Sequence, residues 1–280
     1  MNGKEIEAAE KLINLAMEED IATGDVTTDN LVPPEIRRKA TMVAKAGGVV
    51  AGLEVAEMVF RRLDPALVWE PRVRDGDHVN KGDILVCFEA GYRALLTGER
   101  TALNFLQRMS GIATLSATCA RAVADYKTVI LDTRKTAPGF RLLDKYAVKT
   151  GGATNHRTGL FDMVMIKDNH IEVAGGIPAA IEQIRKKVTP GIRIEVETTT
   201  LEQVQQALDA GADIIMLDNM SIETMARAVK LIRGQAKVEA SGNMTLDRLK
   251  DVAATGVDYI SIGALTHSVK ALDISQRIEP

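Results

Sequence analysis

Short apolar runs and longer amphipathic segments alternate along the chain after Lys127. The apolar runs predict strands at 128–132, 162–167, 192–197, 213–218, 237–241 and 259–263. Between them, apolar residues recur at helical spacing and predict helices at 178–187, 201–210, 222–233 and 246–255. Strands and helices that alternate at intervals of about twenty residues indicate parallel βαβ units.

The part of the chain before Lys127 has a different pattern. An amphipathic helix is predicted at the amino terminus, followed by strand-like, glycine-punctuated sequence over residues 41–89. A long helix is predicted from about Tyr92 to Asp125, with a kink or break at Gly111. We expect this long helix to connect two domains.

The turn between Gly76 and Gly82 resembles half of a lipoyl or biotinyl carrier module. A carrier presents its modified lysine at a hairpin tip, usually beside methionine, and no such pair occurs here. A small β-rich scaffold with the same turn chemistry is therefore the preferred interpretation, because a shared fold does not imply a shared function.

Polar, charged or small residues follow the carboxyl end of nearly every strand predicted after Lys127. They are Asp132 with Arg134 and Lys135, Lys167 with Asp168, Glu197, Asp218, Ser241 and Gly263. A doubly wound sheet would concentrate function at one switch point, whereas an α/β barrel builds its active site from several strand ends. Because polar and charged residues occur at the ends of several strands, the sequence favours an α/β barrel.

Charged residues also alternate with apolar ones inside two of these strands. Glu195 shares a face with Arg193, and Glu239 shares a face with Lys237. Charges inside a buried sheet are costly unless they are paired or face a wet cavity. An interior salt-bridge layer of these four residues and a polar cavity are both open interpretations.

Composition limits the classes of partner. The chain has 280 residues and a formal net charge of -3, which gives no reason to expect nucleic-acid or membrane-surface binding. Cys87 and Cys119 lack metal-ligand spacing and are interpreted as reduced thiols of a cytoplasmic protein, with a disulfide as the alternative. The first twenty residues lack the charged-then-apolar layout expected of a signal peptide, and no apolar run reaches membrane-spanning length.

Several cationic residues stand out in this near-neutral chain. They are Arg100, Arg134, Lys135, His156, Arg157 and Lys167. Any one of these arginines could form a surface ion pair, but the set together suits a small polyanionic substrate, since arginine binds carboxylate or phosphate with two hydrogen bonds.

Small residues after the last two predicted strands suggest a phosphate cradle, because exposed backbone amides there can bind an anion. They are Ser241, Gly242 and Asn243, and then Gly263 and Ala264. Glu197 and Asp218, on neighbouring strands, could hold ribose hydroxyls or Mg²⁺ with its waters. The sequence therefore predicts a site for a phosphorylated sugar and an acidic co-substrate.

A set of motifs along the whole chain resembles the quinolinate phosphoribosyltransferase family. They are EDIATGDVTT, GERTALNFLQRMSGIAT, DTRKTAPGFR, KYAVKTGGATNHRTGLFDMVMIKDNH, VETTT, MLDNM and ASGN. The resemblance implies an α/β protein with an N-terminal, hammerhead-like α/β sandwich and a C-terminal incomplete, TIM-like α/β barrel. The implied domains are residues 1–112, including the linking helix, and 113–280, with the N-terminal helix able to pack on the barrel domain.

The family's activity is a pentosyl transfer in de novo NAD biosynthesis. Phosphoribosyl pyrophosphate and quinolinate give nicotinate mononucleotide, CO2 and pyrophosphate. The resemblance implies Mg²⁺ with phosphoribosyl pyrophosphate and no organic cofactor. It also implies a homodimer, or a larger assembly such as a hexamer, in which Arg100 is donated across the interface, and it implies neither nucleic acid nor membrane as a partner.

The resemblance also assigns site residues to each substrate. Quinolinate would be surrounded by Arg134, His156, Arg157 and Lys167. Thr133 and Lys135 would lie between the two substrates, and Glu197 and Asp218 would face the ribose and its metal, partly through water. The 5'-phosphate would be held by Ser241, Gly242, Asn243, Ile262, Gly263 and Ala264. Those implied to be catalytic are Lys135, Lys167, Glu197 and Asp218, and Asp132 receives no role.

Other functions remain open at this point. In an aldolase-like barrel, Lys135 or Lys167 would form a Schiff base. A related pyrophosphorylase-like enzyme would act on another acidic ring or phosphorylated sugar. A carrier or binding module is the alternative from a different class, and it would require a modified lysine.

Overall fold

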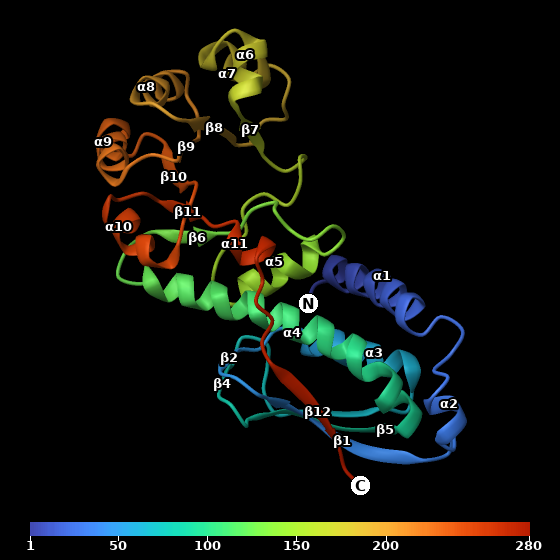
Figure 1. The fold of residues 1–280 in the computed structure, drawn as a ribbon. Coiled ribbons are helices and arrows are strands. Elements are labelled where there is room, and N and C mark those ends of the chain that lie inside the picture. Colours follow the sequence, from blue (N-terminus) through green and yellow to red (C-terminus); the bar gives the residue numbers. More distant parts are fainter. The chain divides into compact units, whose positions relative to one another are not determined.

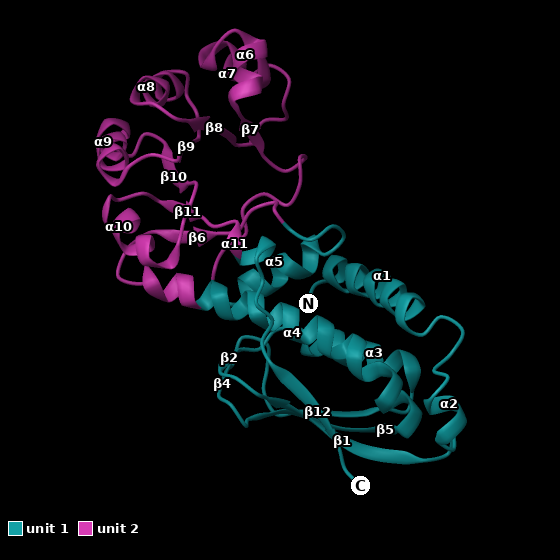
Figure 2. Cartoon of the chain, viewed as in Figure 1, with its two compact units in different colours: residues 1–117, 136–152, 265–280 teal, residues 118–135, 153–264 magenta.

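The computed structural model describes residues 1–280, which form two compact units (Figures 1 and 2). Unit 1 contains residues 1–117, 136–152 and 265–280, and unit 2 contains residues 118–135 and 153–264. Helix α4 (Tyr92–Ala122) begins in unit 1 and ends in unit 2. No helix has the length and apolar character needed to cross a membrane.

Unit 1 is built on an antiparallel four-stranded sheet. Its strands, in spatial order, are β12 (Ile274–Ile278), β1 (Arg37–Ala44), β5 (Ile84–Gly91) and β3 (Val68–Pro71). A second small sheet pairs β2 (Gly48–Val49) with β4 (His78–Val79). Its helices besides α4 are α1 (Gly3–Asp20), α2 (Thr28–Leu31), α3 (Leu53–Leu63) and α5 (Arg141–Thr150), and most of α11 (Ala264–His267) also belongs here.

The units group the chain differently from the predicted segments 1–112 and 113–280. Strand β12 explains part of the difference, because the C-terminal residues add to the edge of the unit 1 sheet by pairing with β1. Helix α1 packs against α3 and α5 within the same unit and buries Ala9 and Ile13. The domain boundary predicted at residue 112 stays a prediction.

Helix α4 continues through Gly111 without interruption, so the predicted break there is wrong. The glycine is needed for a close approach instead. A Cβ atom at this position would lie 2.2 Å from the backbone oxygen of Lys270, far inside contact distance. The missing side chain therefore lets the C-terminal segment cross α4 within unit 1.

Unit 2 is an open parallel sheet of six strands. In spatial order they are β6 (Val129–Leu131), β11 (Tyr259–Ser261), β10 (Lys237–Ser241), β9 (Ile214–Asp218), β8 (Ile194–Thr198) and β7 (Val164–Ile166). All six correspond to predicted strands. The row is curved, and its end strands β6 and β7 do not pair, so the predicted incomplete barrel is confirmed (Figure 1).

Helices of unit 2 connect these parallel strands, as the periodicity predicts. They are α6 (Asp168–Ala174), α7 (Ile177–Arg185), α8 (Leu201–Asp209), α9 (Ile222–Ile232), the 3₁₀ turn η1 (Leu246–Arg248) and α10 (Leu249–Ala254). The strands bury apolar residues on both faces; in β9, Ile215 and Leu217 are buried on one face and Ile214 and Met216 on the other. This burial stabilises the sheet, so functional residues are expected in the loops that follow its strands.

Candidate active site

Unit 2 contains a cavity of about 650 Å³ at the carboxyl ends of its strands. Eleven of the predicted site residues line it. They are Thr133, Arg134, Lys135, His156, Arg157, Lys167, Glu197, Asp218, Ser241, Gly242 and Asn243. These residues come from loops and strand ends that are far apart in sequence, so the expectation that strand ends gather into one place is met.

Four predicted site residues do not line this cavity. Arg100 lies on α4 in unit 1, beside a separate hollow of about 340 Å³ that Asn104 and Arg108 also line. Ile262 is buried, and its backbone N–H donates to the oxygen of Leu131. Gly263 precedes the short helix α11, and Ala264 is its first residue. The predicted roles of these residues stay predictions.

Arg157 is a cation without a carboxylate among its hydrogen-bond partners. Its guanidinium donates to the backbone oxygen of Met163 at 3.2 Å and approaches the sulfur of Met165 at 3.6 Å, and no carboxylate accepts from it. Burial lowers the pKa of Arg157 and the charge of Arg134 lowers it further, while the charges of Glu195 and Asp162 act against this fall without reversing it. A guanidinium without a carboxylate partner, beside a second positive charge, is suited to bind an anion.

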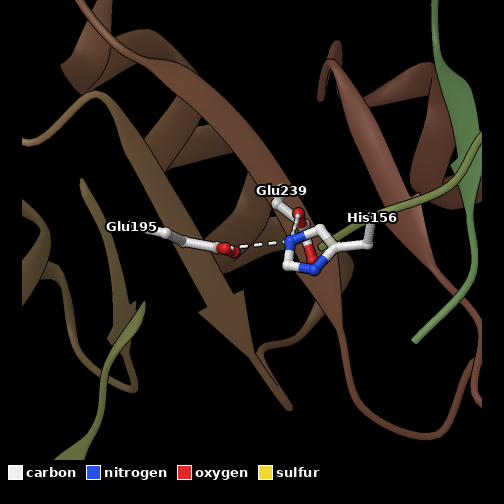
Figure 3. Close-up of side chains that lie close together, drawn as sticks. All are labelled: His156, Glu195 and Glu239. Carbon is white, nitrogen blue, oxygen red and sulfur yellow. Dashed lines mark hydrogen bonds and ion pairs between the residues drawn. The ribbon is translucent and has the colours of Figure 1, made fainter. Parts of the chain in front are cut away.

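His156 is held between two buried glutamates (Figure 3). Its Nε2 lies 2.9 Å from Oε2 of Glu195 on β8 and 3.3 Å from Oε2 of Glu239 on β10. Both glutamate side chains are fully buried, and Ser261 donates its hydroxyl to the other oxygen of Glu239 at 2.5 Å. The backbone N–H of His156 donates to the buried Asp132 at 2.8 Å.

These contacts set the charge of His156. Burial by itself lowers the pKa of this histidine, but the two carboxylates outweigh burial and raise the pKa to about 9. Burial raises the pKa of Glu195 to about 7, with His156 acting against that rise. His156 is therefore an imidazolium at neutral pH, and it adds a fifth cation to the cavity wall.

The interior salt-bridge layer considered above is wrong in its partners. Lys237 is exposed and pairs with Asp258 at 2.6 Å, and Arg193 is exposed. Glu195 and Glu239 point inward as the alternation predicts, but their cation is His156, which comes from a loop. The alternation of residues along the strands predicts that both glutamates face the barrel interior. His156 lies in a loop, and no periodic pattern predicts its position.

Two acidic residues lie on neighbouring strands at the cavity wall. Glu197 pairs in register with Met216 of β9, and Asp218 lies two residues further along, so both side chains face the same side of the sheet. Glu197 forms an ion pair with Lys167. Asp218 accepts a hydrogen bond from Asn219 at 2.8 Å. Sequence reasoning assigned no role to Asn219.

The charge of His156 leads to a prediction about stability and pH. A raised histidine pKa stabilises the folded chain fully below pH 6.5, and this contribution disappears as pH rises toward 9. The difference in unfolding free energy between the wild type and His156→Gln should therefore be larger at pH 6.5 than at pH 9.5. Denaturant unfolding at both values measures it, and a difference that stays constant or grows with pH would contradict a charged His156.

The fold and the cavity together define an α/β-barrel protein with a strongly charged cavity at the carboxyl ends of its strands, which is where barrel enzymes build their active sites. Two family models match, namely the N-terminal domain of quinolinate phosphoribosyl transferase over residues 25–110 and its C-terminal domain over residues 112–277. The chain belongs to the quinolinate phosphoribosyltransferase family, as its motifs predict.

Named relatives agree with this membership. The chain is 48% identical over 287 residues to the chloroplastic nicotinate-nucleotide pyrophosphorylase [carboxylating] of Oryza sativa subsp. japonica, covering 96% of this chain and 77% of the relative. It is 47% identical over 264 residues to the probable nicotinate-nucleotide pyrophosphorylase [carboxylating] of Synechocystis, covering 93% and 89%.

Solved structures show the same fold. NadC from Streptococcus pyogenes has 40% identity and a TM-score of 0.93, with 96% of each chain covered. The nicotinate-nucleotide pyrophosphorylase from Francisella tularensis has 40% identity and a TM-score of 0.94, with 98% of this chain and 96% of that chain covered. The predicted fold class is therefore confirmed.

Proposed function

We propose that this chain transfers a phosphoribosyl group from phosphoribosyl pyrophosphate to quinolinate and releases CO2 and pyrophosphate, giving nicotinate mononucleotide for NAD biosynthesis. We place this reaction in the cavity of unit 2. The observation that carries the proposal is the cavity wall, where cations from several loops face carboxylates from two strands in a chain that belongs to this family throughout. The aldolase-like and carrier alternatives have no comparable support.

Quinolinate is assigned to the cationic part of the wall. Its two carboxylates match the paired charges of Arg134 and Arg157, since a guanidinium can bind a carboxylate with two hydrogen bonds. His156 and Lys167 complete the surroundings of the ring. Because Arg157 has no carboxylate partner of its own, a bound dianion would relieve the repulsion between the two arginines.

Phosphoribosyl pyrophosphate is assigned to the remaining wall. Thr133 and Lys135 lie between the two substrates, with the backbone N–H of Lys135 donating to the hydroxyl of Thr133 at 3.1 Å. Glu197 and Asp218 face the ribose. The 5'-phosphate is assigned to Ser241, Gly242 and Asn243, together with Ile262, Gly263 and Ala264.

The acidic residues of this wall fit magnesium. Mg²⁺ prefers oxygen ligands and usually takes one or two carboxylates with waters and substrate oxygens. Asp218 is the more available of the two, because Glu197 already forms an ion pair with Lys167. When bound, the ion would supply positive charge for the departing pyrophosphate.

The chain's own residues account for the course of the reaction. Departure of pyrophosphate leaves an oxocarbenium-like ribose, which Glu197 and Asp218 can stabilise while Lys135 compensates the charge on the leaving group. The ring nitrogen of quinolinate bonds to C1 of the ribose as the bond to pyrophosphate breaks. The quaternised nitrogen then accommodates the carbanion formed at C2 when the adjacent carboxylate leaves as CO2, and a proton from water takes the place of that carboxylate. Cations that bind the second carboxylate keep the ring oriented, so no general base is assigned.

Product analysis tests the proposed function. Incubation with quinolinate, phosphoribosyl pyrophosphate and Mg²⁺ should give nicotinate mononucleotide, pyrophosphate and CO2 in equal amounts. Borohydride treatment with carbonyl substrates should leave the mass of the chain unchanged, which excludes a Schiff-base lysine. Turnover on a different acidic ring without turnover on quinolinate would contradict the assignment.

A shared active site is a further part of the proposal. Arg100 is exposed on α4 of unit 1 and does not line the unit 2 cavity, so we assign it to the cavity of a neighbouring subunit in a homodimer or larger assembly. Mixing the inactive variants Arg100→Ala and Lys135→Ala should restore activity, because a mixed dimer contains one intact site. Each variant alone serves as the control, and verified mixed dimers without activity would contradict donation across the interface.

A further inference from the structure

Asn219 immediately follows β9 and lines the cavity, yet no step described so far uses it. Its backbone is left-handed, with a φ of 54°. This conformation is uncommon for residues other than glycine, although asparagine tolerates it better than most. The backbone directs the side chain of Asn219 along the cavity wall, between the ends of two neighbouring strands.

Three hydrogen bonds of Asn219 connect those strand ends. Its side-chain amide N–H donates to Oδ2 of Asp218 at 2.8 Å, and its side-chain oxygen accepts from the amide of Asn243 at 3.0 Å. Its backbone N–H donates to the oxygen of Ser241 at 3.0 Å. The amide orientation is chemically determined, because a carboxylate can only accept and so requires the nitrogen on its side.

Gly242 shows how closely the loop after β10 lies against this side chain. A Cβ atom at Gly242 would be 2.3 Å from the side-chain oxygen of Asn219, and the glycine has a φ of 90°. Asn243 is left-handed as well, and Arg248 donates to its backbone oxygen at 2.9 Å. The loop of residues 241–243 therefore packs closely against the side-chain amide of Asn219.

We infer that Asn219 is a positioning residue for phosphoribosyl pyrophosphate. It holds the carboxylate of Asp218 and the loop of Ser241, Gly242 and Asn243 at a fixed separation, so that the ribose and the 5'-phosphate of one substrate meet a preformed surface. The hydrogen bonds of Asn219 go to Asp218, Ser241 and Asn243, which are assigned to the ribose and the 5'-phosphate and not to quinolinate. The inference rests on the proposed function and adds a residue that controls one substrate and not the other.

Asn219→Gly is the most direct test. Glycine adopts the left-handed backbone without strain, so the variant removes the two side-chain hydrogen bonds and little else. We expect the KM for phosphoribosyl pyrophosphate to rise about tenfold, the size expected for losing a hydrogen bond to a charged group, while the KM for quinolinate changes less than twofold. Steady-state kinetics with each substrate varied in turn provides both values.

Two further variants keep the inference testable if Asn219→Gly folds poorly. Gly242→Ala leaves Asn219 in place but forces the loop away from its amide, and it should raise the same KM selectively. Arg233→Gly is the matched control, because Arg233 is also a left-handed residue of unit 2, at the end of α9, and does not line the cavity. It should leave both KM values unchanged.

The outcomes separate the inference from the proposed function. A wild-type chain that does not use phosphoribosyl pyrophosphate and quinolinate overturns the proposed function before any variant is measured. An active wild type with an unchanged KM for phosphoribosyl pyrophosphate in Asn219→Gly and Gly242→Ala overturns the inference alone. An equal rise in both KM values also overturns it, because that result indicates a general structural role.

Discussion

Lys135→Ala should lower kcat for nicotinate mononucleotide formation by about 10² to 10³, the loss typical of removing one group that stabilises charge in a transition state. Lys135 follows β6 at the cavity wall, where we place it between the two substrates. Its charge is needed most when the bond to pyrophosphate breaks, because negative charge then develops on the leaving group. The effect should therefore appear mainly in kcat and less in either KM.

Lys127→Ala is the matched control for this variant. Lys127 is an exposed lysine of the same unit that precedes β6 and does not line the cavity. Steady-state kinetics should find the control indistinguishable from the wild type, and circular dichroism should find both variants folded. A folded Lys135→Ala variant with wild-type kcat would show that Lys135 does not stabilise the transition state.

Arg157→Met should raise the KM for quinolinate by about 100-fold, since a charge-assisted hydrogen-bonded pair with a substrate carboxylate is lost. The same change should leave the free energy of unfolding equal or higher. Burial and the neighbouring Arg134 both disfavour the charge of Arg157, as the lowered pKa of Arg157 indicates. An apolar side chain of similar length removes that cost and keeps the packing.

This combination distinguishes a binding residue from a structural one. Arg227→Met, on α9 and away from the cavity wall, is the control and should leave the KM for quinolinate unchanged. Thermal unfolding without substrate should show no loss for Arg157→Met. If that variant instead unfolds at a lower temperature and binds quinolinate normally, Arg157 supports the fold and the assignment is wrong.

Much of the fold of unit 2 is predictable from local pattern. Apolar runs between helices of regular spacing identify all six parallel strands, because a strand buried on both faces needs a continuous apolar sequence. Strand β12 has no such signal, since ISQRI is short and lies at the edge of a sheet. The continuity of α4 through Gly111 depends on the approach of Lys270, which no local pattern contains.

The site is predictable to the extent that strand ends determine it. Arg134, Lys167 and Asp218 could be placed in one cavity because parallel strands end at the same face. The hydrogen bond from His156 to Asp132 and the contacts of Asn219 could not be predicted. They join loops, and no local sequence pattern determines the conformation of these loops. Asp132, which the sequence left without a role, proves to be a buried acceptor that holds His156 in place.

The family explains what these contacts serve, and the contacts explain how the family's motifs act together. The motif DTRKT supplies Asp132 to the backbone of His156 and places Arg134 and Lys135 at the cavity wall. The motif MLDNM supplies Asp218 and the amide that orients it. Magnesium, the shared Arg100 and a cytoplasmic location stay predictions.

A crystal structure of the chain with quinolinate bound tests the location of the active site most directly. We expect quinolinate in the unit 2 cavity, with its carboxylates in hydrogen-bond contact with Arg134 and Arg157 and its ring nitrogen toward Lys135 and the side of Asp218. Quinolinate bound outside this cavity, or bound within it without contact to either arginine, would contradict the assignment of this cavity as the active site.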